Sequence, residues 1–178
     1  MSDDVRKLSE VVPPPEGRRP DVDWPAVFAA LGTELPRDYR QLISVYGGGQ
    51  FDDHLYLLEP SSSRSGYDIA RLQEERSQAL DEIWKDGEPK PRQLEDGARL
   101  IVWATTDDGQ CVYWLVRPGQ SADDWTLLLQ EGRGPQWEHF AMGCASFLAA
   151  TLTGTVRSKL LSSDYPTDPH TFVPMSAL

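Results

Sequence analysis

The stretch RLIVWATTDDGQCVYWLV, residues 99–116, constrains the fold more than any other part of the chain. It contains two apolar, β-prone runs on either side of Asp108-Gly109. That dipeptide suits the two central positions of a type I′ turn, the tightest connection between antiparallel strands. The sequence therefore predicts a β-hairpin. Counting back from the turn pairs Trp103 with Trp114 on one face.

Helical patterns precede this hairpin. Asp23 is an N-cap for a helix that runs to Leu31 and stops at Gly32. A second helix starts at Leu35-Pro36 and ends in the glycine run 47–49, and the longest helical pattern covers residues 68–86. Between the last two, residues 51–60 form one extended segment, and we expect a strand there.

After the hairpin, residues 125–130 predict another strand, and residues 137–154 predict a final helix with Phe140, Cys144 and Phe147 on its apolar stripe. This order predicts an α+β fold, with helices packed around a mostly antiparallel sheet. Residues 22–156 form the expected domain. Residues 1–21 are Pro-rich and predict a flexible arm, and residues 157–178, with three further prolines, predict a loosely ordered tail.

Composition narrows the function classes. The 178 residues carry a net charge of −11, which disfavours nucleic acid as a partner and favours a basic protein. No apolar run has the length of a membrane span, and the N-terminal residues lack the apolar core of a signal peptide, so we expect a cytoplasmic protein. The two cysteines have no metal-ligand spacing, and we expect neither a metal nor a cofactor.

Few residues suggest catalysis. Cys111 falls in an apolar strand and Cys144 on an apolar helical stripe, where burial suppresses thiol reactivity. His54 and His139 form no triad with them. The glycine run 47–49 follows a helix and precedes a strand, the reverse of a phosphate-binding loop. We therefore expect a protein that is not an enzyme, with a hydrolase or nucleotide-binding enzyme as the less favoured alternative.

Paired acidic residues give the best candidate site. Residues 101–140 contain six acidic residues against two arginines, and residues 46–59 add three more with no lysine or arginine. If these turns meet at one edge of the sheet, they form a negative rim suited to a basic protein surface; the alternative is a merely soluble acidic surface. The candidate partner-binding residues are Asp52, Asp53, Glu59, Asp107, Asp108, Asp123, Asp124 and Trp125.

The run LPRDYRQLISVYGGGQFDDHLYLLEP, residues 35–60, resembles the amino-terminal signature of the SUKH superfamily, in the branch named for yeast cell-wall-synthesis regulators. The similarity includes the Leu-Pro pair, the aromatic Tyr39 and the glycine-rich turn 46–49. It continues through residues 103–105, 107–109 and 113–114 to Trp137 and Phe147.

The resemblance implies a non-catalytic protein-binding fold. In bacteria such domains are often immunity proteins that neutralise a toxin by direct contact, and in yeast they are scaffolds in cell-wall signalling. For this chain we therefore expect an immunity protein that binds a basic toxin domain, with a regulatory scaffold as the alternative.

Overall fold

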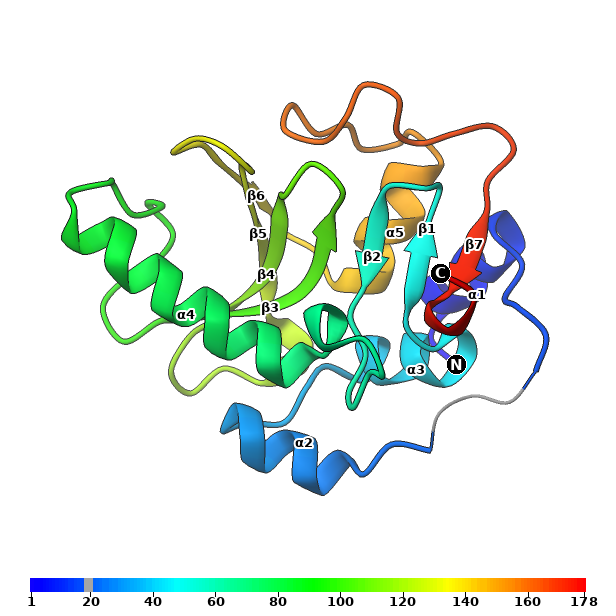
Figure 1. Cartoon of the computed structure of the whole chain (residues 1–178), viewed down its shortest axis with the longest axis horizontal. Coiled ribbons are helices and arrows are strands. Elements are labelled where there is room, and N and C mark those ends of the chain that lie inside the picture. The colour runs from blue at the N-terminus through cyan, green and yellow to red at the C-terminus, as the bar shows by residue number, and fades with distance from the viewer. Residues whose placement is uncertain (18–20) are drawn as a thin grey trace.

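A computed structural model describes residues 1–17 and 21–178. Within them, seven strands form a sheet in the order β6-β5-β4-β3-β2-β1-β7, and every neighbouring pair is antiparallel (Figure 1). This arrangement confirms the predicted α+β class. The elements are α1 (Asp3–Val11), α2 (Trp24–Leu31), α3 (Arg37–Tyr46), β1 (Gly49–Phe51), β2 (Leu55–Leu57), α4 (Ile69–Lys85), β3 (Arg99–Thr106), β4 (Cys111–Val116), β5 (Thr126–Gln130), β6 (Trp137–Phe140), α5 (Cys144–Leu152) and β7 (Phe172–Pro174).

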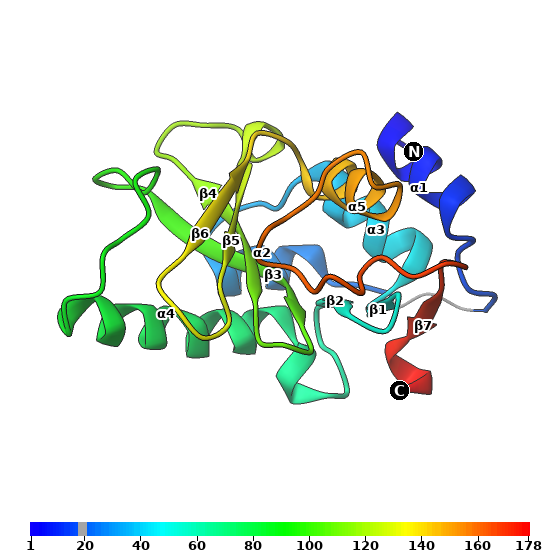
Figure 2. The same ribbon diagram turned by 90° about the horizontal axis from the view of Figure 1, so that it is seen from above.

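Helices cover both faces of the sheet. Helix α4 lies on one side, and α1, α3 and α5 lie on the other (Figure 2). On the α3 and α5 side, the Trp114 ring meets Tyr39 at a centroid distance of 5.0 Å, and the Trp103 ring meets Phe147 at 6.2 Å. Aromatic packing of this kind buries large areas, so these contacts form the centre of the core.

Two helix boundaries follow their capping residues as predicted. Asp23 accepts a hydrogen bond from the Ala26 amide at the start of α2. Helix α3 ends at Gly47, which has a φ of 70°. Glycine adopts this positive φ easily, whereas an L side chain resists it. Asp68, which the sequence includes in the helical pattern, is instead the N-cap of α4 and accepts a hydrogen bond from the Arg71 amide.

The β3–β4 hairpin is confirmed, but its predicted turn and register are wrong. Gly109 has a φ of 85°, whereas Asp108 is not in the left-handed region that a type I′ turn requires at both central residues. The Thr106 amide instead donates to the Gln110 carbonyl, which leaves a three-residue loop. Trp114 lies opposite Ile101, and a bulge at Trp103 brings the two indoles together at 6.0 Å.

The expected single strand over residues 51–60 is two short strands, β1 and β2. Asp52 and Asp53 turn the chain between them with φ values of 48° and 52°. Positive φ at two consecutive residues is the geometry of a type I′ turn, and Asp tolerates it better than most side chains. The tight turn therefore lies one hairpin earlier than the sequence predicts.

The predicted helix over 137–154 is partly wrong. Residues Trp137–Phe140 form β6, which pairs with β5 and places Phe140 opposite Leu127. Helix α5 begins only at Cys144, where the Asp38 carboxylate accepts a hydrogen bond from the Ala145 amide. Trp137 and Phe140 are three positions apart, and so short an apolar pattern does not distinguish a helix from a strand. The pairing with β5 makes this segment a strand.

The predicted flexible arm, residues 1–21, is wrong for the part that forms α1; residues 18–20 of it lie outside the described residues. Val5, Leu8 and Val12 are buried. Their spacing makes one apolar stripe, which packs α1 against α5 and α3. The Tyr46 hydroxyl donates to the Val12 carbonyl at 2.7 Å and ties the end of the helix to α3.

The expected loosely ordered tail, residues 157–178, also joins the fold. Strand β7 pairs with β1, and the Tyr165 and Met175 side chains are buried. Phe172 lies against Gly49, where a Cβ atom would collide with the Phe172 ring. The packed core therefore extends beyond the expected domain limits of 22 and 156 on both sides.

Candidate functional site

Three hairpin turns meet at one end of the sheet. They are residues 52–54 between β1 and β2, 107–109 between β3 and β4, and 131–136 between β5 and β6 (Figure 1). The Asp107 amide donates to the His54 carbonyl at 3.2 Å, which joins the first two turns. A Cβ at Gly132 would contact the backbone of residues 108–110, so the third turn lies directly against the second.

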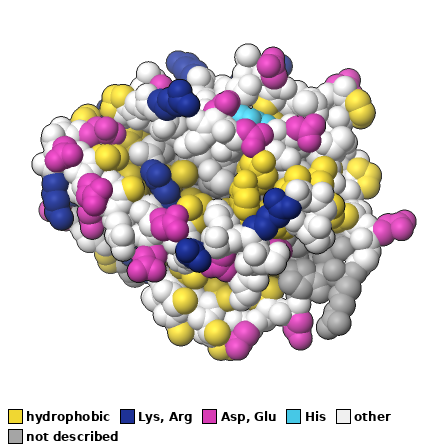
Figure 3. All heavy atoms as spheres, viewed as in Figure 1, with side chains coloured by type: hydrophobic (Ala, Val, Ile, Leu, Met, Phe, Trp, Pro, Cys, Tyr) yellow, Lys and Arg dark blue, Asp and Glu magenta, His cyan; other side chains and the backbone are white. Residues whose placement is uncertain are grey.

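Four acidic residues on these turns form what we call the acidic end: Asp53, Asp107, Asp108 and Glu131. The first three are exposed and Glu131 is half-buried. Asp107, Asp108 and Glu131 border a hollow of about 450 Å³ that Arg133 and Lys159 also line. Figure 3 shows acidic side chains along the upper edge of the molecule, where Figure 1 places the turns, with basic side chains beside them.

Asp107 is fixed in place by its neighbours. Its carboxylate accepts hydrogen bonds from the Tyr56 hydroxyl at 2.7 Å and from the Gln50 amide at 3.1 Å. Burial and the bond to Asp107 raise the pKa of Tyr56, so this phenol stays a hydrogen-bond donor at neutral pH. These hydrogen bonds therefore tie the Asp107 carboxylate to β1 and β2.

Asp53 and Asp108 are different. Among the described residues, neither carboxylate has a hydrogen bond or an ion pair, although their backbones lie in turns closed by hydrogen bonds. They are free charges on a rigid frame, the arrangement that steers and orients a charged partner.

Asp52, by contrast, is misassigned as a partner-binding residue. Its side chain is fully buried, and its carboxylate accepts hydrogen bonds from the Thr171 amide at 2.7 Å, the Thr167 amide at 3.0 Å and His170 Nδ1 at 2.8 Å. Because all of these donors belong to the C-terminal segment, Asp52 fastens that segment to the β1–β2 turn.

The remaining candidates lie at the opposite end of the sheet. Glu59, beyond the far end of β2, accepts a hydrogen bond from the Gly48 amide at 2.7 Å and packs on that glycine. Asp123 binds the backbone amide and the Nε of Arg37. Burial acts to raise the pKa of Asp123, but these hydrogen bonds outweigh it and lower the pKa. The candidate acidic residues therefore lie at two opposite ends of the sheet and do not form the single rim that the sequence predicts.

Two neighbours of Asp123 share that far position. Trp125 is 4% exposed and packs against Trp114 at 6.2 Å, so it belongs to the core rather than to an interface. Asp124 is exposed, and it is too far along the sheet to join the acidic end.

The catalytic candidates of the sequence, two cysteines and two histidines, lie on different segments of the fold. Cys144 is buried, and burial raises the pKa of its thiol well above the ordinary value, with nearby Asp38 adding to the effect. Cys111 is buried in β4. His139 is exposed on β6 and bonds Thr126 Oγ1. His54 is 7% exposed and lies against Tyr165, and burial lowers its pKa. Among the described residues, no hydrogen bond joins any two of these four side chains.

Glu131 and Lys159 join the site, although neither is among the candidate partner-binding residues of the sequence. Glu131 belongs to the six acidic residues counted along 101–140, so its charge is visible there, but its place beside Asp108 depends on the close approach at Gly132. Lys159 lies in the expected tail, where no local pattern indicates docking.

Comparison with protein-family models, with curated proteins and with solved structures finds no match to this chain. Within residues 1–17 and 21–178, no three His, Cys, Asp or Glu side chains are grouped in a way that could hold a metal ion. None of the helices described is long and apolar enough to span a bilayer.

Proposed function

We propose that this chain is a non-catalytic protein-binding domain whose acidic end binds a basic surface of another protein. The observation that carries the proposal is the pair of exposed carboxylates, Asp53 and Asp108, which have no internal partners and stand on two turns joined by a hydrogen bond. A partner that neutralises them does not first have to break an internal ion pair, and it finds them already positioned.

The surrounding groups favour a protein over a simple ion. Arg133 and Lys159 border the same hollow as Asp107 and Asp108, so the end carries a pattern of both signs rather than a uniform negative field. Such a pattern fixes the register of a partner that bears complementary charges. The net charge of −11 adds a long-range attraction for basic proteins.

The partner we propose is a basic toxin domain, which makes this chain an immunity protein. This more specific proposal rests on the resemblance to the SUKH superfamily of residues 35–60, 103–105, 107–109 and 113–114, with Trp137 and Phe147. A scaffold that binds a cellular protein would use the same surface, and the identity of the partner separates the two.

Affinity capture with three matched baits tests the proposal: the unmodified chain, Asp53→Lys/Asp108→Lys, and a control, Glu74→Lys/Glu75→Lys. The control changes two exposed carboxylates on α4 and gives the same net charge as the test variant. We expect a basic protein to be recovered by the unmodified and control baits and lost from the Asp53→Lys/Asp108→Lys bait. Equal recovery by all three baits would contradict the proposal.

The recovered partner then decides its class. A toxin whose growth inhibition is relieved by the unmodified chain, and not by Asp53→Lys/Asp108→Lys, would establish the immunity role. A partner without toxicity would favour the scaffold. Circular dichroism of each bait tests whether the variant is folded.

A further inference from the structure

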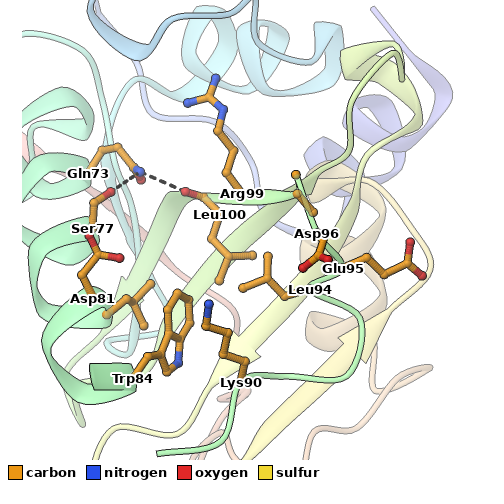
Figure 4. A pocket seen from close by; sticks show the side chains of 13 residues that line it. Gln73, Ser77, Asp81, Trp84, Lys90, Leu94, Glu95, Asp96, Arg99 and Leu100 are labelled. Atoms are coloured by element: carbon orange, nitrogen blue, oxygen red, sulfur yellow. Dashed lines mark hydrogen bonds between the residues drawn. The ribbon is translucent and has the colours of Figure 1, made fainter. Parts of the chain in front are cut away.

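A second candidate site lies far from the acidic end, between α4, the first residues of β3 and the connection 86–98. These segments enclose a pocket of about 370 Å³ (Figure 4). Its floor is apolar: Leu80 is 4% exposed and Leu100 is 7% exposed, with Leu94 and the Trp84 ring beside them. The floor can therefore receive a hydrocarbon chain.

One wall of this pocket is held rigidly. The Gln73 side chain bridges α4 and β3, because its Nε2 donates to the Leu100 carbonyl at 2.9 Å and its Oε1 accepts from the Val102 amide at 2.8 Å. The same Nε2 donates to Ser77 Oγ at 2.8 Å. Gln73 thus fills the hydrogen-bonding positions that a neighbouring strand would take at this edge of β3, and it fixes the spacing of the wall.

A cation already occupies part of the pocket. Lys90 Nζ lies 4.9 Å from the centre of the Trp84 ring, within the range of a cation–π interaction. Lys90 is exposed and belongs to the connection 86–98, and its ammonium group has no carboxylate within ion-pair distance among the described residues. The chain therefore places one of its own ammonium groups on the aromatic floor.

The charges around the pocket favour a second cation over an anion. Asp81 on α4 and Asp96 on the connection lie on opposite sides of it, and Glu95 extends away (Figure 4). Neither the Asp81 nor the Asp96 carboxylate has a hydrogen bond or ion pair with another described residue. Arg99 points away from the pocket and donates to the Leu31 carbonyl at 3.0 Å, so Lys90 is the available positive group.

We propose that this pocket binds an aliphatic chain that ends in an ammonium group, with the chain on Leu80, Leu94 and Leu100 and the ammonium over the Trp84 ring, in the electrostatic field of Asp81 and Asp96. Lys90 is the internal stand-in for this ligand, and binding displaces it. The ligand is either a lysine side chain of a peptide or a free alkylamine, which present the same chemistry. The site is independent of the acidic end, so either can fail without the other.

The test follows the indole N–H resonance of Trp84 by NMR, assigned with Trp84→Phe, during titration of the full chain. The ligands are Nα-acetyl-lysine methylamide, butylamine, and Nα-acetyl-norleucine methylamide, which has the same stem without the charge. We expect the lysine compound to bind about tenfold more tightly than the norleucine compound, since a cation–π contact and two exposed carboxylates contribute together. Tighter binding by butylamine than by the lysine compound would assign the pocket to free amines, and the reverse to lysine side chains.

Three variants make the test specific. Lys90→Ala removes the internal competitor and should tighten binding of the lysine compound severalfold. Asp81→Asn/Asp96→Asn should weaken it about threefold to tenfold. Glu95 also lines the pocket, but its carboxylate extends away from it (Figure 4), so Glu95→Gln should leave binding unchanged. Equal affinity for the lysine and norleucine compounds, or no gain in Lys90→Ala, would overturn the proposal. The amide spectrum of each variant reports that the fold is retained.

Discussion

Leu8→Ala tests whether α1 is part of the folded core. Leu8 is 0% exposed and lies on the stripe that packs α1 against α5 and α3. Truncating a fully buried leucine costs about 2 to 5 kcal/mol, depending on how far the site can collapse. Helix α1 is short and close to the chain end, so its neighbours can close around the missing atoms. We therefore expect the lower half of that range, about 2 to 3 kcal/mol.

For a domain of this size that loss lowers the thermal midpoint by about 4 to 12 °C. Urea unfolding followed by circular dichroism gives the free energy directly. The control is Lys7→Ala, on the same helix, because the Lys7 side chain is 63% exposed and its removal should cost less than about 0.5 kcal/mol. A Leu8→Ala protein as stable as Lys7→Ala would show that α1 does not pack on the domain and that the flexible-arm interpretation was right.

Three further substitutions probe the turns. Asp52→Asn keeps a residue that tolerates positive φ but leaves one fewer acceptor for the C-terminal segment; it should cost about 1 to 3 kcal/mol, and hydrogen exchange at the Thr167 and Thr171 amides should accelerate. Gly109→Val should cost about 1 to 3 kcal/mol in chemical denaturation, because an L side chain strains the backbone at φ 85°, whereas the added Cβ would make only an ordinary contact with Gly132 Cα at 3.9 Å. Burial lowers the pKa of His54, so its contribution to stability is complete above pH 6.5 and is lost as the pH falls through the folded pKa. His54→Gln should therefore flatten the loss of unfolding free energy between pH 7 and 5.5, and an unchanged slope would refute the assignment.

Local signals in the sequence were enough to predict the boundaries of the helices that have clear capping residues. Asp23 and Gly47 fix the start of α2 and the end of α3 through a hydrogen bond and through backbone conformation within a few residues, and such short-range effects do not depend on the rest of the fold. The hairpin 99–116 was predictable for the same reason. Its register was not, because the bulge at Trp103 depends on how both indoles pack between α3 and α5.

The errors arise where distant segments decide the structure. Helix α1 has only two buried residues, Val5 and Leu8, and the prolines that follow it dominate the composition of residues 1–21. Strand β7 forms because β1 offers a free edge and Asp52 holds the segment that leads to it. The contacts between α1 and α5 and between β1 and β7 join residues more than a hundred positions apart, which periodicity cannot reveal.

In the candidate site, too, local features could be predicted from the sequence and features set by distant contacts could not. The sequence identified Asp53, Asp107 and Asp108 as turn acids, and register alone places their turns at one end of the sheet. The sequence alone could not distinguish these residues from Asp52, because only the fold shows that the Asp52 carboxylate binds the C-terminal segment. Asp123 and Asp124 were grouped with them by charge, although β4 and β5 carry that connection to the opposite end.

The central claim is that the acidic end is the binding surface, and the salt dependence of association tests it most directly. Stopped-flow or surface plasmon resonance measurements with the recovered partner would compare the unmodified chain, Asp53→Lys/Asp108→Lys and Glu74→Lys/Glu75→Lys. We predict that rising salt slows association of the unmodified chain far more than it hastens dissociation, that the first variant loses about 100-fold or more in affinity, and that the second stays within about threefold. Equal losses in the two variants would show that only net charge matters, and the acidic end would then not be the interface.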